Sequence, residues 1–135
     1  MGIVIGIIGV LISLWMIKLQ FFSKPKEELE HMILLFQSTQ KLSLQVQNEL
    51  ETLIVQYNGW ECEMLPNFTY RTCLEEMKES FKTNLTDDVL QKFVSQNPSK
   101  TTILSAIKSL EIQLENLTQF QKNLNLVRRQ MANNE

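Results

Sequence analysis

An uncharged apolar run opens the chain and constrains what the remainder can become. Residues 2–17 contain no charged side chain, and beyond Lys18 the apolar character resumes as far as Phe22. Counted from Gly2 to Phe22 the run has 21 residues. As a helix it would measure about 32 Å, enough to cross the hydrocarbon core of a bilayer. The sequence therefore predicts a transmembrane helix over residues 1–22, followed by a hinge over 23–25.

The flanks of this run favour an uncleaved anchor and indicate its orientation. A secretory signal peptide, which is the alternative, has a basic start and a small-residue cleavage site, and neither pattern is present. Lys18, Lys24 and Lys26 lie at the C-terminal side of the run, and no Lys or Arg precedes it. Because positive flanks stay in the cytoplasm, we expect the N-terminus outside and residues 23–135 in the cytoplasm.

Small residues recur within the apolar run at spacings of three or four, namely Gly2, Gly6, Gly9 and Ser13. Small residues four apart let two membrane helices approach closely, so these are candidates for membrane-helix packing. The alternative is that they reflect the general abundance of glycine in membrane helices.

The composition of the chain is that of a helical protein. The 135 residues include only 4 Gly and 3 Pro, and no segment shows the apolar–polar alternation of a strand. The formal net charge is −2, and acidic and basic residues are intermixed. We therefore expect an all-α fold and no surface for nucleic acid.

Residues 26–57 predict one long amphipathic helix. Neither Gly nor Pro interrupts them, and Glu27 and Glu28 suit the positive end of a helix dipole. Apolar residues recur at heptad spacing, with polar exceptions in the middle of the seam at Thr39 and Ser43. The expected seam is Leu29, Met32, Phe36, Thr39, Ser43, Val46, Leu50, Leu53 and Tyr57.

Residues 98–131 predict a second long helix, with a short tail over 132–135. Asn97, Pro98 and Ser99 supply an N-terminal cap and a first-turn proline. The heptad pattern is cleaner here, and Ile107 and Leu114 widen it into the face of a bundle. The expected seam is Ile103, Ala106, Leu110, Gln113, Leu117, Phe120, Leu124, Val127 and Met131.

Residues 58–97 are expected to form a compact cap region. Asn58 and Gly59 would end the first long helix, one short helix would run from about 70 to 82, and Thr86 would cap another. Since the two long helices have similar lengths, we expect an antiparallel pair with facing stripes. The two short helices would cap one end, so that residues 26–131 form one helical bundle, a coiled-coil hairpin.

No pattern in the chain indicates catalysis or a cofactor. His31 is the only histidine and falls on the solvated side of the first long helix. Cys62 and Cys73 have no further ligands at metal spacing; they would form a disulfide outside the cytoplasm or stay buried thiols within it. We expect a non-enzymatic protein without catalytic, cofactor-binding or metal-binding residues.

Two hypotheses for the function remain open. The first is a membrane-anchored interaction or adaptor module that binds a partner protein, or a second copy, on the cytoplasmic side. The second places the bundle outside the cytoplasm as a binding protein, such as an inhibitor or immunity factor, with a disulfide between Cys62 and Cys73. Candidate contacts are the apolar residues outside the seams, namely Leu34, Leu35, Leu42, Leu44, Ile112 and Leu126.

Overall fold

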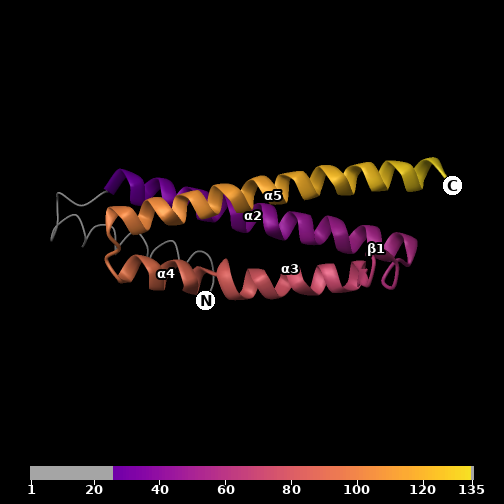
Figure 1. The fold of residues 1–135 in the computed structure, drawn as a ribbon, viewed down its shortest axis with the longest axis horizontal. Helices are drawn as coiled ribbons and strands as arrows, with labels where there is room; N and C mark the ends of the chain where they lie inside the picture. Colours follow the sequence, from indigo (N-terminus) through magenta and orange to yellow (C-terminus); the bar gives the residue numbers. More distant parts are fainter. Residues whose placement is uncertain (1–25, 135) are drawn as a thin grey trace.

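The computed structural model describes residues 26–134, which are predominantly helical (Figure 1), so the expected all-α class is confirmed. These residues form helices α2 (Lys26–Tyr57), α3 (Tyr70–Asn84), α4 (Asp87–Ser95) and α5 (Lys100–Asn133). An antiparallel hairpin of β1 (Glu63–Leu65) and β2 (Phe68–Thr69) lies between α2 and α3. No helix among them is long and apolar enough to span a membrane.

Several predictions concern residues outside this described part of the chain. The transmembrane helix over 1–22 and the hinge over 23–25 lie there, as do the four small residues Gly2, Gly6, Gly9 and Ser13.

Side-chain caps set the starts of three helices. Thr69, Thr86 and Ser99 are the N-caps of α3, α4 and α5, and each hydroxyl accepts a hydrogen bond from the backbone N–H three residues later. Such bonds satisfy donors that have no partner within the helix. The cap at Thr86 agrees with the sequence prediction, whereas α5 is capped by Ser99 and begins two residues later than predicted. Pro98 precedes the cap of α5, so it does not occupy the first turn as predicted.

Asparagines in the left-handed conformation end two of the helices. Asn58 has a φ of 49°, and the N–H of Gly59 donates to the carbonyl of Ile54 at 2.9 Å, as in a Schellman motif. Asn97, with a φ of 50°, follows α4, and its own N–H donates to the carbonyl of Val94 at 3.2 Å. The end of α2 lies where the sequence placed it, although asparagine, and not the adjacent glycine, adopts the positive φ.

The two long helices run parallel, so the predicted antiparallel pair is wrong. Figure 1 shows that α2 and α5 begin at the same end of the molecule. The Lys100 ammonium lies 3.4 Å from Glu28, and further along Gln121 Nε2 donates to Glu49 Oε2 at 3.1 Å. Both pairs join residues 72 positions apart, so the register stays constant between these two contacts.

The predicted cap across one end of the pair is also wrong. Parallel neighbours need a connection that returns along their length, and α3 and α4, lying nearly end to end, provide it (Figure 1). Leu74 of α3 and Leu90 and Val94 of α4 are buried in this position. The described residues therefore form an elongated bundle of three rows: α2, α5 and the composite row α3–α4.

The hairpin, which the sequence analysis did not predict, closes the end of the bundle where α2 stops. Pro66 and Asn67 form its turn, and the φ of 63° at Asn67 is one that asparagine tolerates. The Arg71 guanidinium lies 5.0 Å from the centroid of the Trp60 ring, and its Nε donates to Glu61 at 2.7 Å. These contacts fix the start of α3 to the loop that precedes β1.

The core consists of two apolar clusters. One cluster, at the α4 end of the bundle, comprises Leu29, Met32, Ile33, Phe36, Leu85, Leu90, Val94, Ile103, Ile107 and Leu110. The other, at the hairpin end, comprises Val46, Leu50, Leu53, Ile54, Cys73, Leu74 and Leu124.

A layer of buried polar residues on α2 separates these clusters. The layer consists of Thr39, Gln40, Ser43 and Gln47. The Nε2 group of Gln40 donates to the backbone carbonyl of Leu85 at 2.6 Å and to Asp87 Oδ1 at 3.0 Å. Because Leu85 and Asp87 flank the junction of α3 and α4, these two bonds hold the composite row onto the middle of α2.

We expect Gln40→Leu to lower the free energy of unfolding by about 1–3 kcal/mol, since it leaves the Leu85 carbonyl and the Asp87 carboxylate without their buried donor. Gln56→Leu, at an exposed position of the same helix, is the matched control and should change stability by less than about 0.5 kcal/mol. Urea unfolding followed by circular dichroism measures both. Equal losses in the two variants would contradict the role of Gln40.

Candidate functional site

A groove runs along the bundle between the composite row α3–α4 and α5, with α2 as its floor. Its larger hollow, between α3 and α5, has a volume of about 370 Å³. A second hollow of about 200 Å³ lies between α4 and α5. Gln113 lines both, so the two hollows adjoin along α5.

The groove forms because α2 covers only part of the apolar stripe of α5. Ile103, Ile107 and Leu110 are buried in the α4-end cluster. Further along the same helix, Leu117 and Phe120 are only half-buried and line the larger hollow. The apolar stripe of α5 is therefore wider than the part that α2 covers, and α3 leaves the rest of the stripe partly exposed.

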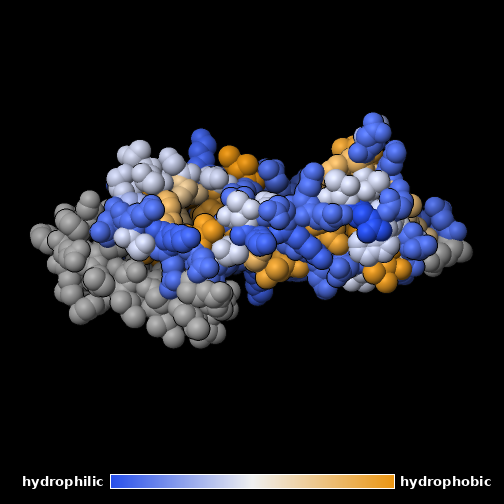
Figure 2. All heavy atoms as spheres, turned by 90° about the horizontal axis from the view of Figure 1, so that it is seen from below, coloured by the Kyte–Doolittle hydropathy of each residue, from blue (hydrophilic) through white to orange (hydrophobic). Residues whose placement is uncertain are grey.

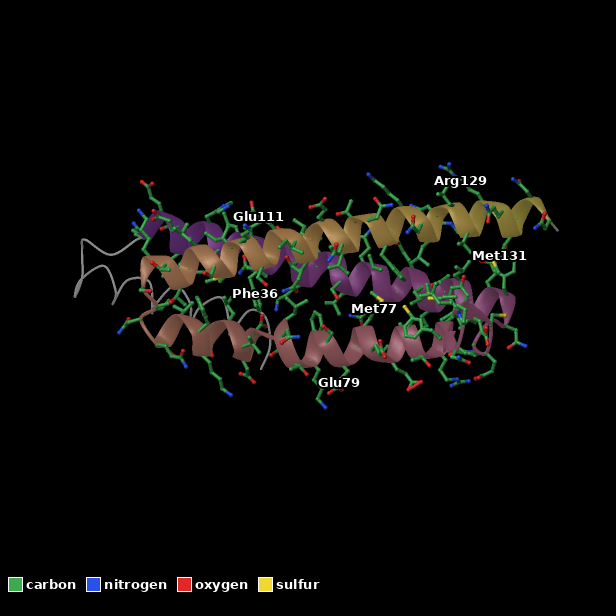
Figure 3. The ribbon with its side chains drawn as sticks, viewed as in Figure 1. Phe36, Met77, Glu79, Glu111, Arg129 and Met131 are labelled. Carbon is green, nitrogen blue, oxygen red and sulfur yellow. The ribbon has the colours of Figure 1, made fainter. Side chains whose placement is uncertain are left out.

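The opposite wall combines one apolar side chain with several polar ones. Met77 points from α3 toward α5 in Figure 3, whereas Glu79 points away from the bundle. Glu76 and Ser80 line the larger hollow from α3, and Ser43 of the polar layer reaches it from the floor. This combination of apolar walls and a few polar groups is typical of binding clefts.

Cys73 lies in the wall of the groove, and Cys62 lies in the loop before β1. Both are free thiols in the structure, Cys62 exposed and Cys73 buried, so the disulfide considered from the sequence does not join them. Burial, with a smaller contribution from Glu76, raises the pKa of Cys73 to about 11. Because the thiolate is the reactive form, this shift lowers the reactivity of Cys73 near neutral pH.

The contact residues predicted from the sequence fall into two groups. Leu35 and Leu42 are half-buried and pack against the two core clusters. The other four are exposed but occupy separate points on two helices: Leu34, Leu44, Ile112 and Leu126. On the face shown in Figure 2, hydrophobic areas likewise appear as separate patches among hydrophilic residues.

The groove was not predicted from the sequence, although polar residues interrupt the apolar seams of both long helices in this region. Gln113 interrupts the seam of α5, and Thr39 and Ser43 interrupt that of α2; all three lie at or near the groove. Polar residues at seam positions of two neighbouring helices can mark a place where the core opens.

The side chains that could bind a metal ion do not cluster in the described part of the chain. His31 is exposed, as its heptad position predicted. Residues 26–134 contain no group of three or more His, Cys, Asp or Glu side chains placed to hold a metal ion.

Comparisons of the chain with protein families, with curated proteins and with solved structures found no match.

Burial of Cys73 gives a labelling prediction. In the Cys62→Ser variant, unfolding should accelerate maleimide labelling of Cys73 at least about tenfold, because its pKa falls from about 11 toward the ordinary 9.0 and the lower nucleophilicity of the less basic thiolate offsets part of the gain. The Cys73→Ser variant, which retains only the exposed Cys62, is the control and should label readily in both states. Fast labelling of Cys73 in the folded protein would show that the groove wall is not packed as described.

Proposed function

We propose that this chain is a single-pass, membrane-anchored and non-enzymatic interaction module. Residues 1–22 would hold the protein at the bilayer, and the bundle would present its groove to a partner protein, or to a second copy, on the cytoplasmic side. The observation that carries the proposal is the apolar run, which is uncharged over residues 2–17 and continues beyond Lys18 to Phe22, only a few residues before α2 begins. Tethering of this kind raises the local concentration of the bundle at the membrane.

The groove supports the interaction part of the proposal. Amphipathic helices bind in apolar grooves of this kind through side chains spaced three and four residues apart. The half-buried side chains that line it, Met77, Phe93, Leu117 and Phe120, are better placed for one partner than the scattered leucines on the outer faces.

The orientation rests on the lysines that follow the run. Lys18, Lys24 and Lys26 give the C-terminal side three positive charges within nine residues, and the N-terminal side has no basic side chain. This asymmetry favours a cytoplasmic bundle.

A second candidate function keeps the anchor and places the bundle outside the cytoplasm, as a binding protein such as an inhibitor or immunity factor. It is favoured by the positions of the two thiols. Burial is the main cause of the raised pKa of Tyr70, and both Cys62 and Cys73 add to it, so both lie near this ring. In an oxidising compartment a disulfide between them would stabilise the fold by about 2–3 kcal/mol.

Membrane anchoring has a direct test in cell fractionation. We expect the full chain to stay in the membrane pellet after an alkaline carbonate wash, and a variant lacking residues 2–22 to be released. Circular dichroism of the shortened chain checks that its bundle remains folded. Recovery of the full chain, with its N-terminus intact, in the soluble fraction would contradict the proposal.

The same cells test the side of the membrane, because Cys62 is an exposed native reporter. A membrane-impermeant maleimide should label Cys62 only after lysis, and the Cys62→Ser variant controls for other reactive sites. Labelling of intact cells, directly or after reduction, would reject the cytoplasmic arrangement and favour the second candidate.

A further inference from the structure

The groove is the open side of an incomplete four-helix arrangement. Residues 26–134 supply three rows, and none of these described elements occupies the fourth position, which is bounded by α5 and the composite row along the hollows described above. From Ala106 to Phe120 the groove follows α5 over 15 residues, a rise of about 21 Å along the helix. A single helix is the element whose width and apolar stripe fit such a position.

The chain itself supplies a segment of suitable length beside one end of the groove. Met32 and Phe36, in the first turns of α2, line the hollow between α4 and α5, and Phe36 lies between these elements in Figure 3. Residues 1–25 therefore join the bundle next to this end. Their apolar run of 21 residues would measure about 32 Å as a helix, longer than the groove.

The connection also permits a reversal of direction. Residues 23–25 separate the run from Lys26 and include Pro25, and helix–helix connections of two to eight residues are usual. Small residues at Gly2, Gly6, Gly9 and Ser13 would let a helix lie close to the floor of the groove. An uncovered apolar run of this length in water is unfavourable.

We propose that residues 2–22 dock in the groove as a fourth helix, antiparallel to α2, when they are not inserted in a bilayer. The groove covers one side of this helix, whereas lipid covers all sides, so a bilayer competes with docking. This inference goes beyond the proposed function, in which residues 1–22 act only as a membrane anchor. Docking can also be measured without lipid.

Intramolecular cross-linking of the full chain tests the docking. The full chain, made without membranes and with both native cysteines replaced by serine, receives Ser80→Cys together with Gly6→Cys, Gly9→Cys or Ser13→Cys. Ser80 is exposed and lines the groove, whereas the neighbouring Glu79 points away from the bundle (Figure 3) and gives the matched control Glu79→Cys. A short bis-maleimide should cross-link at least one Ser80→Cys pair several-fold more efficiently than the matching Glu79→Cys pair.

Two further measurements make the test specific. Leu117→Lys, at a half-buried groove position, should reduce the cross-linking, and urea unfolding of the chain lacking residues 2–22 checks that this variant still folds. Addition of phosphatidylcholine–phosphatidylglycerol vesicles should also lower the yield, because the run moves into lipid.

The outcomes separate this inference from the proposed function. Equal yields for the two α3 positions, or products only between two chains, would overturn docking, and the latter would identify a second copy as the occupant. Loss of cross-linking in every condition, with the chain retained in membranes, would overturn docking alone. Efficient cross-linking that vesicles do not reduce would overturn the competition with the bilayer, and would count against the anchor as well.

Discussion

The parallel packing of α2 against α5 is the interaction on which the rest of the structure depends. Polar contacts at Glu28–Lys100 and Glu49–Gln121 mark its register, but exposed polar pairs contribute little to stability. The apolar clusters on either side of the polar layer supply most of the free energy. Because parallel helices need a connection that returns along their length, this pairing also requires the row α3–α4. That row packs on α2 and leaves the side facing α5 open.

The polar layer gives the bundle its specificity at the point where α3 and α4 meet. Two apolar clusters alone would leave this junction free to slide along α2. Gln40 fixes it, because its amide donates to acceptors on both sides of the junction, and buried acceptors without partners are costly. Ser43, one helical turn further, belongs to the same layer and forms part of the groove floor. The layer that positions the composite row therefore also positions the candidate site.

The sequence was sufficient to locate most of the helices and their buried faces. The uninterrupted segment 26–57 coincides with α2, and Thr86 caps the helix that it was expected to cap. Helix direction could not be predicted in this way, since a heptad pattern identifies the buried face of a helix but neither its partner nor its polarity. Leu117 and Phe120 illustrate the same limit for the groove: their seam positions predict burial, yet only an assembled bundle shows that they are half covered. The membrane anchor remains a prediction from residues 1–22.

The most direct test of the parallel arrangement is a pair of distances between spin labels in solution. In a chain whose native cysteines are replaced by serine, labels at Glu28→Cys and Lys100→Cys should lie close together, because these side chains are in contact. Labels at Glu28→Cys and Arg128→Cys should lie much farther apart. Position 128 is about 42 Å further along α5 than position 100, because 28 helical steps separate them. A short distance from 28 to 128, with a long one from 28 to 100, would contradict the arrangement.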